Sequence, residues 1–283
     1  MKRNIFFTAI FGMAAIMLIA ISCSKESMII QDDAQIALIS EDAEDAMIDE
    51  EILDEVLGDL EKYDFLKSAE TCPVKTIVRP VEGEYPIIVT KDFGDGCYKY
   101  ENGRMRSGKI IVTIFGPWRK KGSTRVVTFE NYMHGKTLVD GEKEILSMGK
   151  SEEGYYWHKI NGEIVLTREK DGKPLIINRK VKKDRYLING YKDADTPKEW
   201  LIEGKVQVKK SNDVSYVVKI VEPLYRIQGC RWIQAGLKNI EIGDDLIQID
   251  YSFAGQDEQS CDSWIKRWIN DEEAEEIDLN AKH

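Results

Sequence analysis

Apolar and polar residues alternate over short segments through most of the chain after residue 65. These segments are rich in β-branched and aromatic side chains, which is typical of strands with one buried face. No helical stretch long enough for a parallel crossover separates them, so the pattern predicts an antiparallel meander of about a dozen strands. Such a curved sheet forms a barrel or half-barrel, or folds into a sandwich of two layers, and the pattern does not choose between these forms. The segments are GKIIVTIFG (108–116), STRVVTFENYM (123–133), GYYWHKI (154–160), GEIVLTREK (162–170), PLIINRKV (174–181), EWLIEGKVQVKK (199–210) and SYVVKIV (215–221).

Six dipeptides that end in glycine punctuate these segments. Asn-Gly and Asp-Gly supply the positive φ that a two-residue hairpin turn requires, so each dipeptide is interpreted as a turn between neighbouring strands. They are Asn102-Gly103, His134-Gly135, Asp140-Gly141, Asn161-Gly162, Asp171-Gly172 and Asn189-Gly190.

Residues 31–64 follow a different pattern, with apolar positions close to helical spacing and acidic residues on the other faces. The pattern predicts an amphipathic acidic helix. Ser40 precedes several acids and is able to cap a second segment, so a break into two helices near Ser40 is an alternative. We expect the half from Ile52 to Leu60 to dock on the β domain; the alternative is that the helix holds that domain away from the membrane.

Charge is distributed unevenly around a net value of −10. Residues 26–64 contain 15 acids and one base, and residues 271–283 contain six acids. The 29 acids and 35 bases of residues 65–270 leave that region basic. A basic domain can bind nucleic acid, but these bases are spread along predicted strands and the acidic flanks would oppose a polyanion. We therefore expect no nucleic-acid partner.

The first 22 residues resemble a lipoprotein signal peptide. Lys2 and Arg3 precede an uncharged apolar run that ends just before Cys23. In bacterial lipoproteins a cysteine at this place is acylated and becomes the new N-terminus, so the resemblance implies lipidation of Cys23 and attachment to a membrane. The alternative is a plain transmembrane anchor, because about 18 uncharged residues just span a bilayer. Residues 23–30 then form a linker.

The residues after Cys23 bear on the destination of the protein. No Asp follows directly, so retention at the inner membrane is not indicated, and outer-membrane attachment is expected. Lys25-Glu26 is half of the signal that directs lipoproteins of the Bacteroidota to the cell surface. The periplasmic face and the cell surface therefore both stay open.

Four further cysteines, Cys72, Cys97, Cys230 and Cys261, agree with export to an oxidising compartment. The segments around the first two and the last two share one plan, in which a cysteine, two short strands and a glycine-containing turn lead to a second cysteine. Of three possible connectivities, this plan favours Cys72–Cys97 and Cys230–Cys261. No cysteine pair has CxxC spacing and the chain contains three histidines, so no metal site is expected.

Several motifs are similar to those of a group of uncharacterised lipoproteins from the Bacteroidota. They are DFGDGC, NGRMRSGKIIVTIFG, GSTRVVTFENYMHGKTLVDGEKEI and VEPLYRIQGCRWIQAGLKNIEI, in this order. The resemblance covers most of residues 30–265 and implies an exported lipoprotein of β architecture. It transfers no catalytic residue.

The stretch KDFGDGCYKYENG invites a calcium interpretation through Asp92, Asp95 and Glu101. Calcium prefers six to eight oxygen ligands at alternating loop positions, whereas aromatic residues and a cysteine occupy much of this loop. A structural turn is therefore expected. His134 and His158 are interpreted as a turn residue and a strand residue, because no nucleophile motif accompanies them. A carboxylate pair for glycoside hydrolysis depends on the fold and is kept as an alternative.

The most specific binding candidate is an aromatic pair. In CDSWIKRWIN, Trp264, Lys266 and Trp268 share one face of a strand and Ile265 and Ile269 the other. An exposed pair of Trp264 and Trp268 would bind a glycan, a peptide or an envelope protein. The alternative, which we favour, is that these tryptophans pack in the core or cover the acidic helix.

The chain is accordingly divided into a signal peptide (1–22), a linker (23–30), an acidic helical segment (31–64), an antiparallel β domain (65–270) and an acidic disordered tail (271–283). We expect a monomeric, membrane-anchored lipoprotein with a non-catalytic binding or envelope-structural role and no cofactor. The alternatives are a carrier of a lipid or another apolar ligand in a half-open barrel, and a hydrolase.

Overall fold

The computed structural model describes residues 32–58, 72–82, 84–98, 104–191, 196–252, 261–270 and 274–281. This part of the chain forms one helix and one fourteen-stranded antiparallel sheet, which confirms the predicted meander with an acidic N-terminal helix. The elements are α1 (Asp32–Gly58), β1 (Val74–Val78), β2 (Ile87–Asp92), β3 (Cys97–Tyr98), β4 (Met105–Ile114), β5 (Thr124–His134), β6 (Thr137–Lys150), β7 (Tyr156–Lys170), β8 (Lys173–Asn189), β9 (Glu199–Lys210), β10 (Ser215–Ile227), β11 (Ala235–Ile242), β12 (Asp245–Asp250), β13 (Trp264–Ile269) and β14 (Glu275–Asp278).

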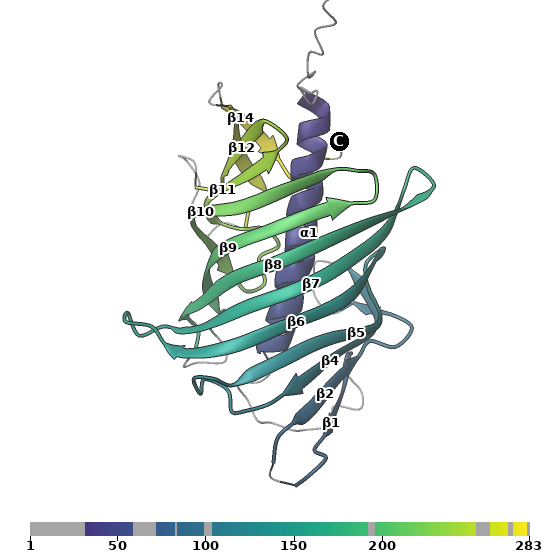
Figure 1. The fold of residues 1–283 in the computed structure, drawn as a ribbon, viewed down its shortest axis with the longest axis vertical. Coiled ribbons are helices and arrows are strands. Elements are labelled where there is room, and N and C mark those ends of the chain that lie inside the picture. Colours follow the sequence, from purple (N-terminus) through teal and green to yellow (C-terminus); the bar gives the residue numbers. More distant parts are fainter. Residues whose placement is uncertain are drawn as a thin grey trace, which may run out of the picture.

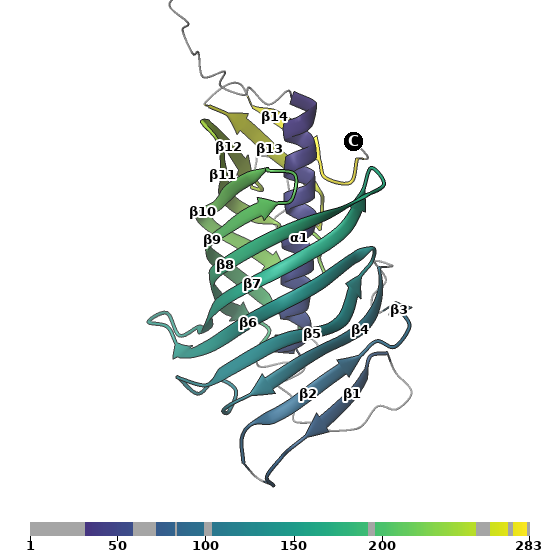
Figure 2. The ribbon, with the colours of Figure 1, turned by 45° about the vertical axis from the view of Figure 1, so that its right-hand side comes forward.

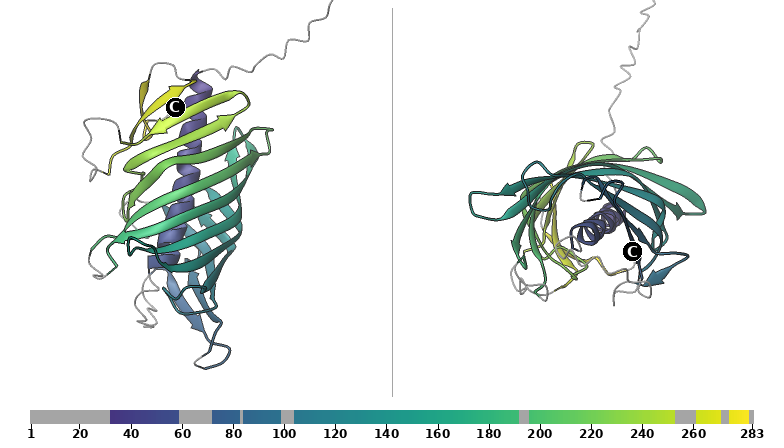
Figure 3. Two further views of the ribbon diagram at one scale, coloured as in Figure 1. Left: turned by 60° about the vertical axis from the view of Figure 1, so that its left-hand side comes forward. Right: turned by 90° about the horizontal axis from the view of Figure 1, so that it is seen from below.

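The sheet curves around the helix as a half-barrel (Figure 1). Neighbouring strands in the sheet are neighbours in sequence, except that β3 pairs with β4 beside the main path. The view from below shows α1 inside the concave face, with one side of the half-barrel open (Figure 3). Register shifts interrupt many of the strand pairs, and bulges of this kind bend strands and increase their twist. The sequence pattern did not choose between a barrel, a half-barrel and a sandwich, and the structure is a half-barrel.

Side chains alternate between the two faces of the sheet, as β8 shows most clearly. Its inward positions are buried and its intervening positions are more exposed along the length of the strand. The inward row mixes apolar and basic residues: Leu175, Ile177, Arg179, Val181, Lys183, Arg185 and Leu187. The concave face is therefore both the hydrophobic core and a basic surface.

α1 is one continuous helix, so the alternative of two helices with a break near Ser40 is wrong. It is also buried on nearly all sides, whereas an amphipathic helix would keep its acidic face in water. Ile39, Met47 and Leu53 are at most 3% exposed, so the whole helix docks and not only its second half. Residues 59–64, the end of the predicted helical segment, lie outside the described residues, as do Cys23 and the segments on either side of it.

Two of the predicted turns lie within strands. Asp140-Gly141 is inside β6 and Asn161-Gly162 is inside β7, so segments 154–160 and 162–170 form one strand. A β-carbon built on Gly141 would lie 2.1 Å from the carbonyl oxygen of Glu163, and one on Gly162 would lie 2.9 Å from Lys143 Cγ. Close packing, and not chain reversal, explains these glycines. The dipeptides at His134-Gly135 and Asp171-Gly172 do reverse the chain between neighbouring strands.

The acidic tail is partly ordered, which corrects the prediction that residues 271–283 are disordered. Residues Glu275–Asp278 form β14, which pairs with β13. Ile277 and Leu279 are buried in the core, 4% and 6% exposed. Burial of these two apolar side chains, together with the pairing to β13, holds a segment that its composition alone would leave in solvent.

Two disulfides join Cys72 to Cys97 and Cys230 to Cys261, the pairing that the sequence comparison favoured. The Cα atoms are 6.2 Å and 5.1 Å apart, within the usual range for a bridge. Each bridge closes a local segment, of 25 and 31 residues in separation.

In the part of the chain that the structure describes, no helix has the length and apolar character needed to cross a membrane.

Candidate functional site

The concave face of the sheet presents a row of basic side chains to the acidic helix. We call this surface the basic trough. Every acid of α1 from Glu41 to Glu55, nine in number, lies within 4.0 Å of at least one of these bases. The trough consists of Lys91, Arg104, Arg106, His134, Lys143, Arg168, Lys170, Arg179, Lys183, Arg185, Lys210, Arg226, Arg231 and Lys238.

Asp49 and Glu50 mark the middle of the trough. Lys143 binds Asp49, and Lys183 Nζ lies 2.8 Å from both Asp49 Oδ2 and Glu50 Oε1. All four side chains are at most 6% exposed. Burial alone would raise the pKa of Asp49, but the two lysines outweigh it and hold that pKa below its usual value. The acid is therefore ionised at neutral pH in the interior of the protein.

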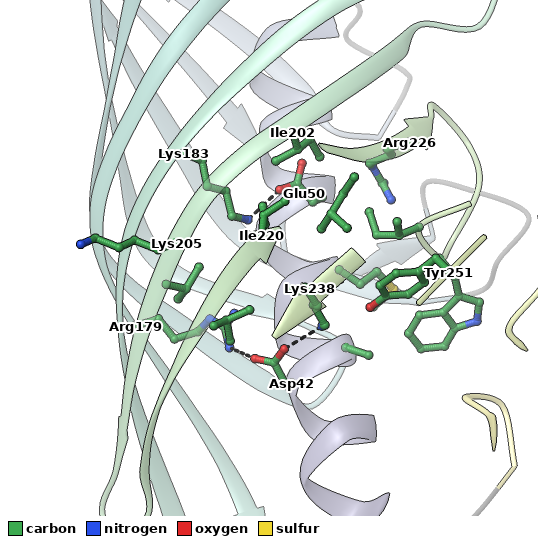
Figure 4. A pocket seen from close by; sticks show the side chains of 18 of the residues that line it. Asp42, Glu50, Arg179, Lys183, Ile202, Lys205, Ile220, Arg226, Lys238 and Tyr251 are labelled. Carbon is green, nitrogen blue, oxygen red and sulfur yellow. Dashed lines mark hydrogen bonds and ion pairs between the residues drawn. The ribbon is translucent and has the colours of Figure 1, made fainter. Parts of the chain in front are cut away.

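Asp42 is held in the same way nearer to the start of α1. Lys238 Nζ lies 2.9 Å from Oδ2, and Arg179 Nη1 lies 3.2 Å from Oδ1 (Figure 4). Burial opposes ionisation, but Lys238 and then Arg179 lower the pKa of Asp42 overall. The two bases come from β8 and β11, so one carboxylate joins distant parts of the sheet to the helix.

The last turns of α1 contact both early and late strands. Asp54 binds Arg185 from β8 and lies 2.9 Å from Arg226 Nη2 of β10. Glu55 Oε1 lies 2.6 Å from Lys91 Nζ of β2. The contacts of this short segment span the sheet, so the position of the helix is determined from both sides of the half-barrel.

Glu51 is shared by an arginine and a histidine. It binds Arg106, and its Oε2 lies 2.7 Å from His134 Nε2. Burial would raise the pKa of Glu51, but the bond to His134 and the charge of Arg106 lower it to about 2. Burial lowers the pKa of His134 in spite of Glu51, so at neutral pH the uncharged ring donates Nε2–H to the carboxylate.

Glu44 pairs with two arginines that come from different parts of the sheet. Arg104 Nη2 and Arg231 Nη2 lie 2.9 Å and 3.3 Å from the same oxygen, Glu44 Oε1. Arg104 stands just before β4 and Arg231 just after β10, so they reach the helix from opposite walls. The three side chains are 27–44% exposed, unlike the buried pairs of the trough. We call this group the Glu44 clasp.

α1 does not fill the trough completely. A cavity of about 50 Å³ lies between the helix and strands β9–β11 (Figure 4). On the helix side it is lined by Ala43, Ala46 and Met47 together with the acids Asp42 and Glu50. On the sheet side apolar residues alternate with bases; the apolar ones are Ile202, Val206, Val218, Ile220, Leu224, Trp232, Ile233 and Tyr251, and the bases are Arg179, Lys183, Lys205, Arg226, Arg231 and Lys238. Two small side chains thus face a wall of apolar residues and bases.

His158 forms a separate buried cluster. Its ring stacks on Trp118 at 4.8 Å, and it is 0% exposed. Burial, then Arg125 and Arg185, lowers the pKa of His158 to about 3. It is a strand residue, as predicted, but faces inward.

The aromatic pair predicted as a binding surface lies on β13, away from the trough. Trp264 is 44% exposed and Trp268 is half-buried, while Ile265 is buried on the opposite face. The predicted division of faces is therefore present; binding by this pair stays a prediction.

The segment around Asp92 and Asp95, which was considered as a calcium loop, forms a turn. Asp92 Oδ1 accepts a hydrogen bond from the Gly94 amide at 2.8 Å. Glu101 lies outside the described residues. Within the described residues no group of three His, Cys, Asp or Glu side chains is placed to hold a metal ion.

The basic trough is the feature that sequence reasoning missed. A signal was present, because Arg179, Lys183 and Arg185 occupy the same alternating positions as Val181 and Leu187. Bases in phase with apolar residues point to a charged partner on the buried face. The 15 acids of residues 26–64 were the oppositely charged partner for these bases.

Comparison of this chain with protein-family models, with curated proteins and with solved structures finds no match in any of the three.

Proposed function

We propose that this protein is an exported lipoprotein of the outer membrane, attached through a lipid on Cys23, with a non-catalytic binding role. In this proposal it belongs with the Bacteroidota lipoproteins that its motifs resemble. α1 is the element that joins the anchor to the β domain.

The observation that carries the proposal is the set of ion pairs by which the basic trough binds α1. The helix begins nine residues after Cys23, a distance of about 30 Å at most for an extended chain. Ion pairs then hold it to the sheet from Glu41 to Glu55. A pull on the lipid anchor is therefore distributed over most strands of the half-barrel.

The state of the carboxylates supports a non-catalytic role. A general acid needs a raised pKa near the working pH, whereas cations lower the pKa of Asp42, Asp49, Asp54 and Glu51. Burial raises the pKa of Asp45, but this carboxylate is paired with Arg168. These carboxylates are engaged in ion pairs on a helix, which disfavours the hydrolase alternative.

The contents of the half-barrel count against a carrier of apolar ligands. α1 occupies the concave face, and the cavity beside it, about 50 Å³, is smaller than the sites that hold drug-sized ligands, about 300 Å³ or more. The surrounding bases would also oppose an apolar chain without a charged group.

Two measurements test the proposal. Cells grown with radioactive palmitate should label the protein, and Cys23→Ala should abolish the label and move the protein to the soluble fraction. Cleavage at a protease site inserted within residues 59–71 should leave the β domain on the membrane, because α1 still binds it. Labelling of the alanine variant would refute the anchor, and release of the β domain on cleavage would refute the role of α1.

A further inference from the structure

We propose that the basic trough is a receptor for an acidic helix of another protein, and that α1 is its resident occupant, which a better-fitting helix displaces. This rests on the proposed binding role and names its ligand class: a helix that carries carboxylates and apolar side chains in the pattern of α1.

The chemistry of the trough defines this class. Its bases are buried beside apolar residues, as Lys143 and Lys183 are beside Ile160 and Val181. Loss of α1 without replacement would leave this apolar surface in water and the bases without their acids. The trough therefore exchanges one helix for another and does not stand empty. A ligand without carboxylates would leave the bases of the trough without acids. A ligand without apolar side chains would leave its apolar residues uncovered.

The cavity shows that α1 fits imperfectly. Ala43 and Ala46 line the 50 Å³ cavity together with apolar residues of β9 and β10, such as Ile202, Val206 and Val218. A larger apolar side chain at either position would extend into the cavity, and buried methylene groups strengthen binding. A competing helix with larger apolar residues at these two positions therefore gains contacts that α1 lacks.

The open side of the half-barrel provides the route. Figure 2 shows α1 running lengthwise inside the half-barrel, from the β12–β14 end to the β4–β5 end. The Glu44 clasp joins α1 to Arg104 beside β4 and to Arg231 after β10, and its side chains are partly exposed. Exposed ion pairs are weak, so the two ion pairs of the Glu44 clasp open at little cost in free energy.

A displacement experiment tests the proposal on the complete chain. A protease site is inserted within residues 59–71, the folded protein is cut, and the N-terminal fragment stays as occupant. Peptides of residues 32–58 are then titrated in, and release of the labelled fragment is followed by fluorescence anisotropy. Besides the native sequence, the peptides carry Ala46→Leu, Ala37→Leu as the matched control away from the cavity, and Asp42→Asn with Asp49→Asn.

The Ala46→Leu peptide should displace the fragment at a concentration about tenfold lower than the native or Ala37→Leu peptide. The doubly neutral peptide should displace it at least tenfold more weakly than the native one. Equal potency of the native and Ala46→Leu peptides would indicate a trough that prefers its own helix, as in exchange between copies, and would overturn the proposal. So would failure of all peptides.

A second measurement avoids the cleavage step. In the intact chain Ala46→Leu should raise the thermal midpoint and Ala37→Leu should not, because only the first fills the cavity. A lower midpoint for Ala46→Leu would show that the cavity accepts no larger side chain. Neither measurement depends on lipidation of Cys23. The receptor proposal can therefore be refuted while the lipid anchor is supported by the palmitate experiment, and the reverse is also possible.

Discussion

His158 lies face to face with Trp118, with the ring centroids 4.8 Å apart. Among the described residues neither ring nitrogen of His158 has a hydrogen-bond partner. An uncharged imidazole tolerates this environment, but an imidazolium beside Arg125 and Arg185 does not, which is why the pKa of His158 falls to about 3.

The first prediction follows from this pKa. The unfolded chain protonates His158 near pH 6.5, whereas the folded protein keeps it neutral down to about pH 3, so protons favour unfolding between these values. The free energy of unfolding should fall by about 2 kcal/mol from pH 6.5 to pH 5 because of this group. His158→Phe keeps a ring against Trp118 and should remove this part of the dependence, as urea titrations at several pH values would measure. An unchanged pH dependence in the variant would contradict the assignment.

A second prediction concerns the middle of the trough. Asp49→Asn leaves Lys143 and Lys183 buried without their shared anion, so it should lower the free energy of unfolding by about 3–5 kcal/mol. Glu163→Gln is the control, because its pair with Lys180 is exposed and should contribute less than about 1 kcal/mol. Similar losses for the two variants in chemical denaturation would contradict a special role of the trough.

A third prediction tests the close contact under Lys143. A β-carbon at residue 162 would lie 2.9 Å from Lys143 Cγ and 3.0 Å from the Glu142 carbonyl oxygen. Gly162→Ala should therefore push Lys143 from its position and cost about 1–3 kcal/mol of stability. Asn161→Ala, at the exposed neighbouring position, should change the thermal midpoint little. Equal midpoints for both variants would argue against the contact.

The fourth prediction concerns the second disulfide. Replacement of both Cys230 and Cys261 by serine should lower the free energy of unfolding by about 3–4 kcal/mol, from the entropy of the loop that the bridge closes. Because Arg231 follows Cys230 directly, the Glu44 clasp should also loosen, and amide exchange in α1 near Glu44 should accelerate. Non-reducing peptide mapping that joined Cys72 to Cys230 would contradict the pairing itself.

The strands and their order were accessible from sequence because alternation and turn chemistry are local. The disulfide pairing was accessible too, since its two segments share a plan. Asn161-Gly162 was misread because the dipeptide serves a turn or a close packing contact equally well, and only the neighbour, Lys143, decides which. Ile277 shows the same limit, since its burial depends on β13 and not on its own acidic neighbourhood.

The candidate site was out of reach of sequence reasoning for a related reason. Helical periodicity assigns Asp49 and Glu50 to a polar face, and a polar face is normally solvated. Whether that face meets water or a row of lysines depends on strands about a hundred residues away. The excess of acids before residue 64 and of bases after it was visible, but charge totals do not say that the two sets meet in the interior.

The order of α1 in the chain has a consequence for folding. The helix is synthesised first, and its partners follow at separations from 36 residues for Lys91 and Glu55 to 196 for Lys238 and Asp42. Contacts so distant in sequence form slowly, and a nascent acidic helix has little stability of its own. The sheet must therefore assemble around a template that becomes rigid only as the last strands arrive, so we expect late, cooperative folding, with truncation after β9 leaving α1 unstructured.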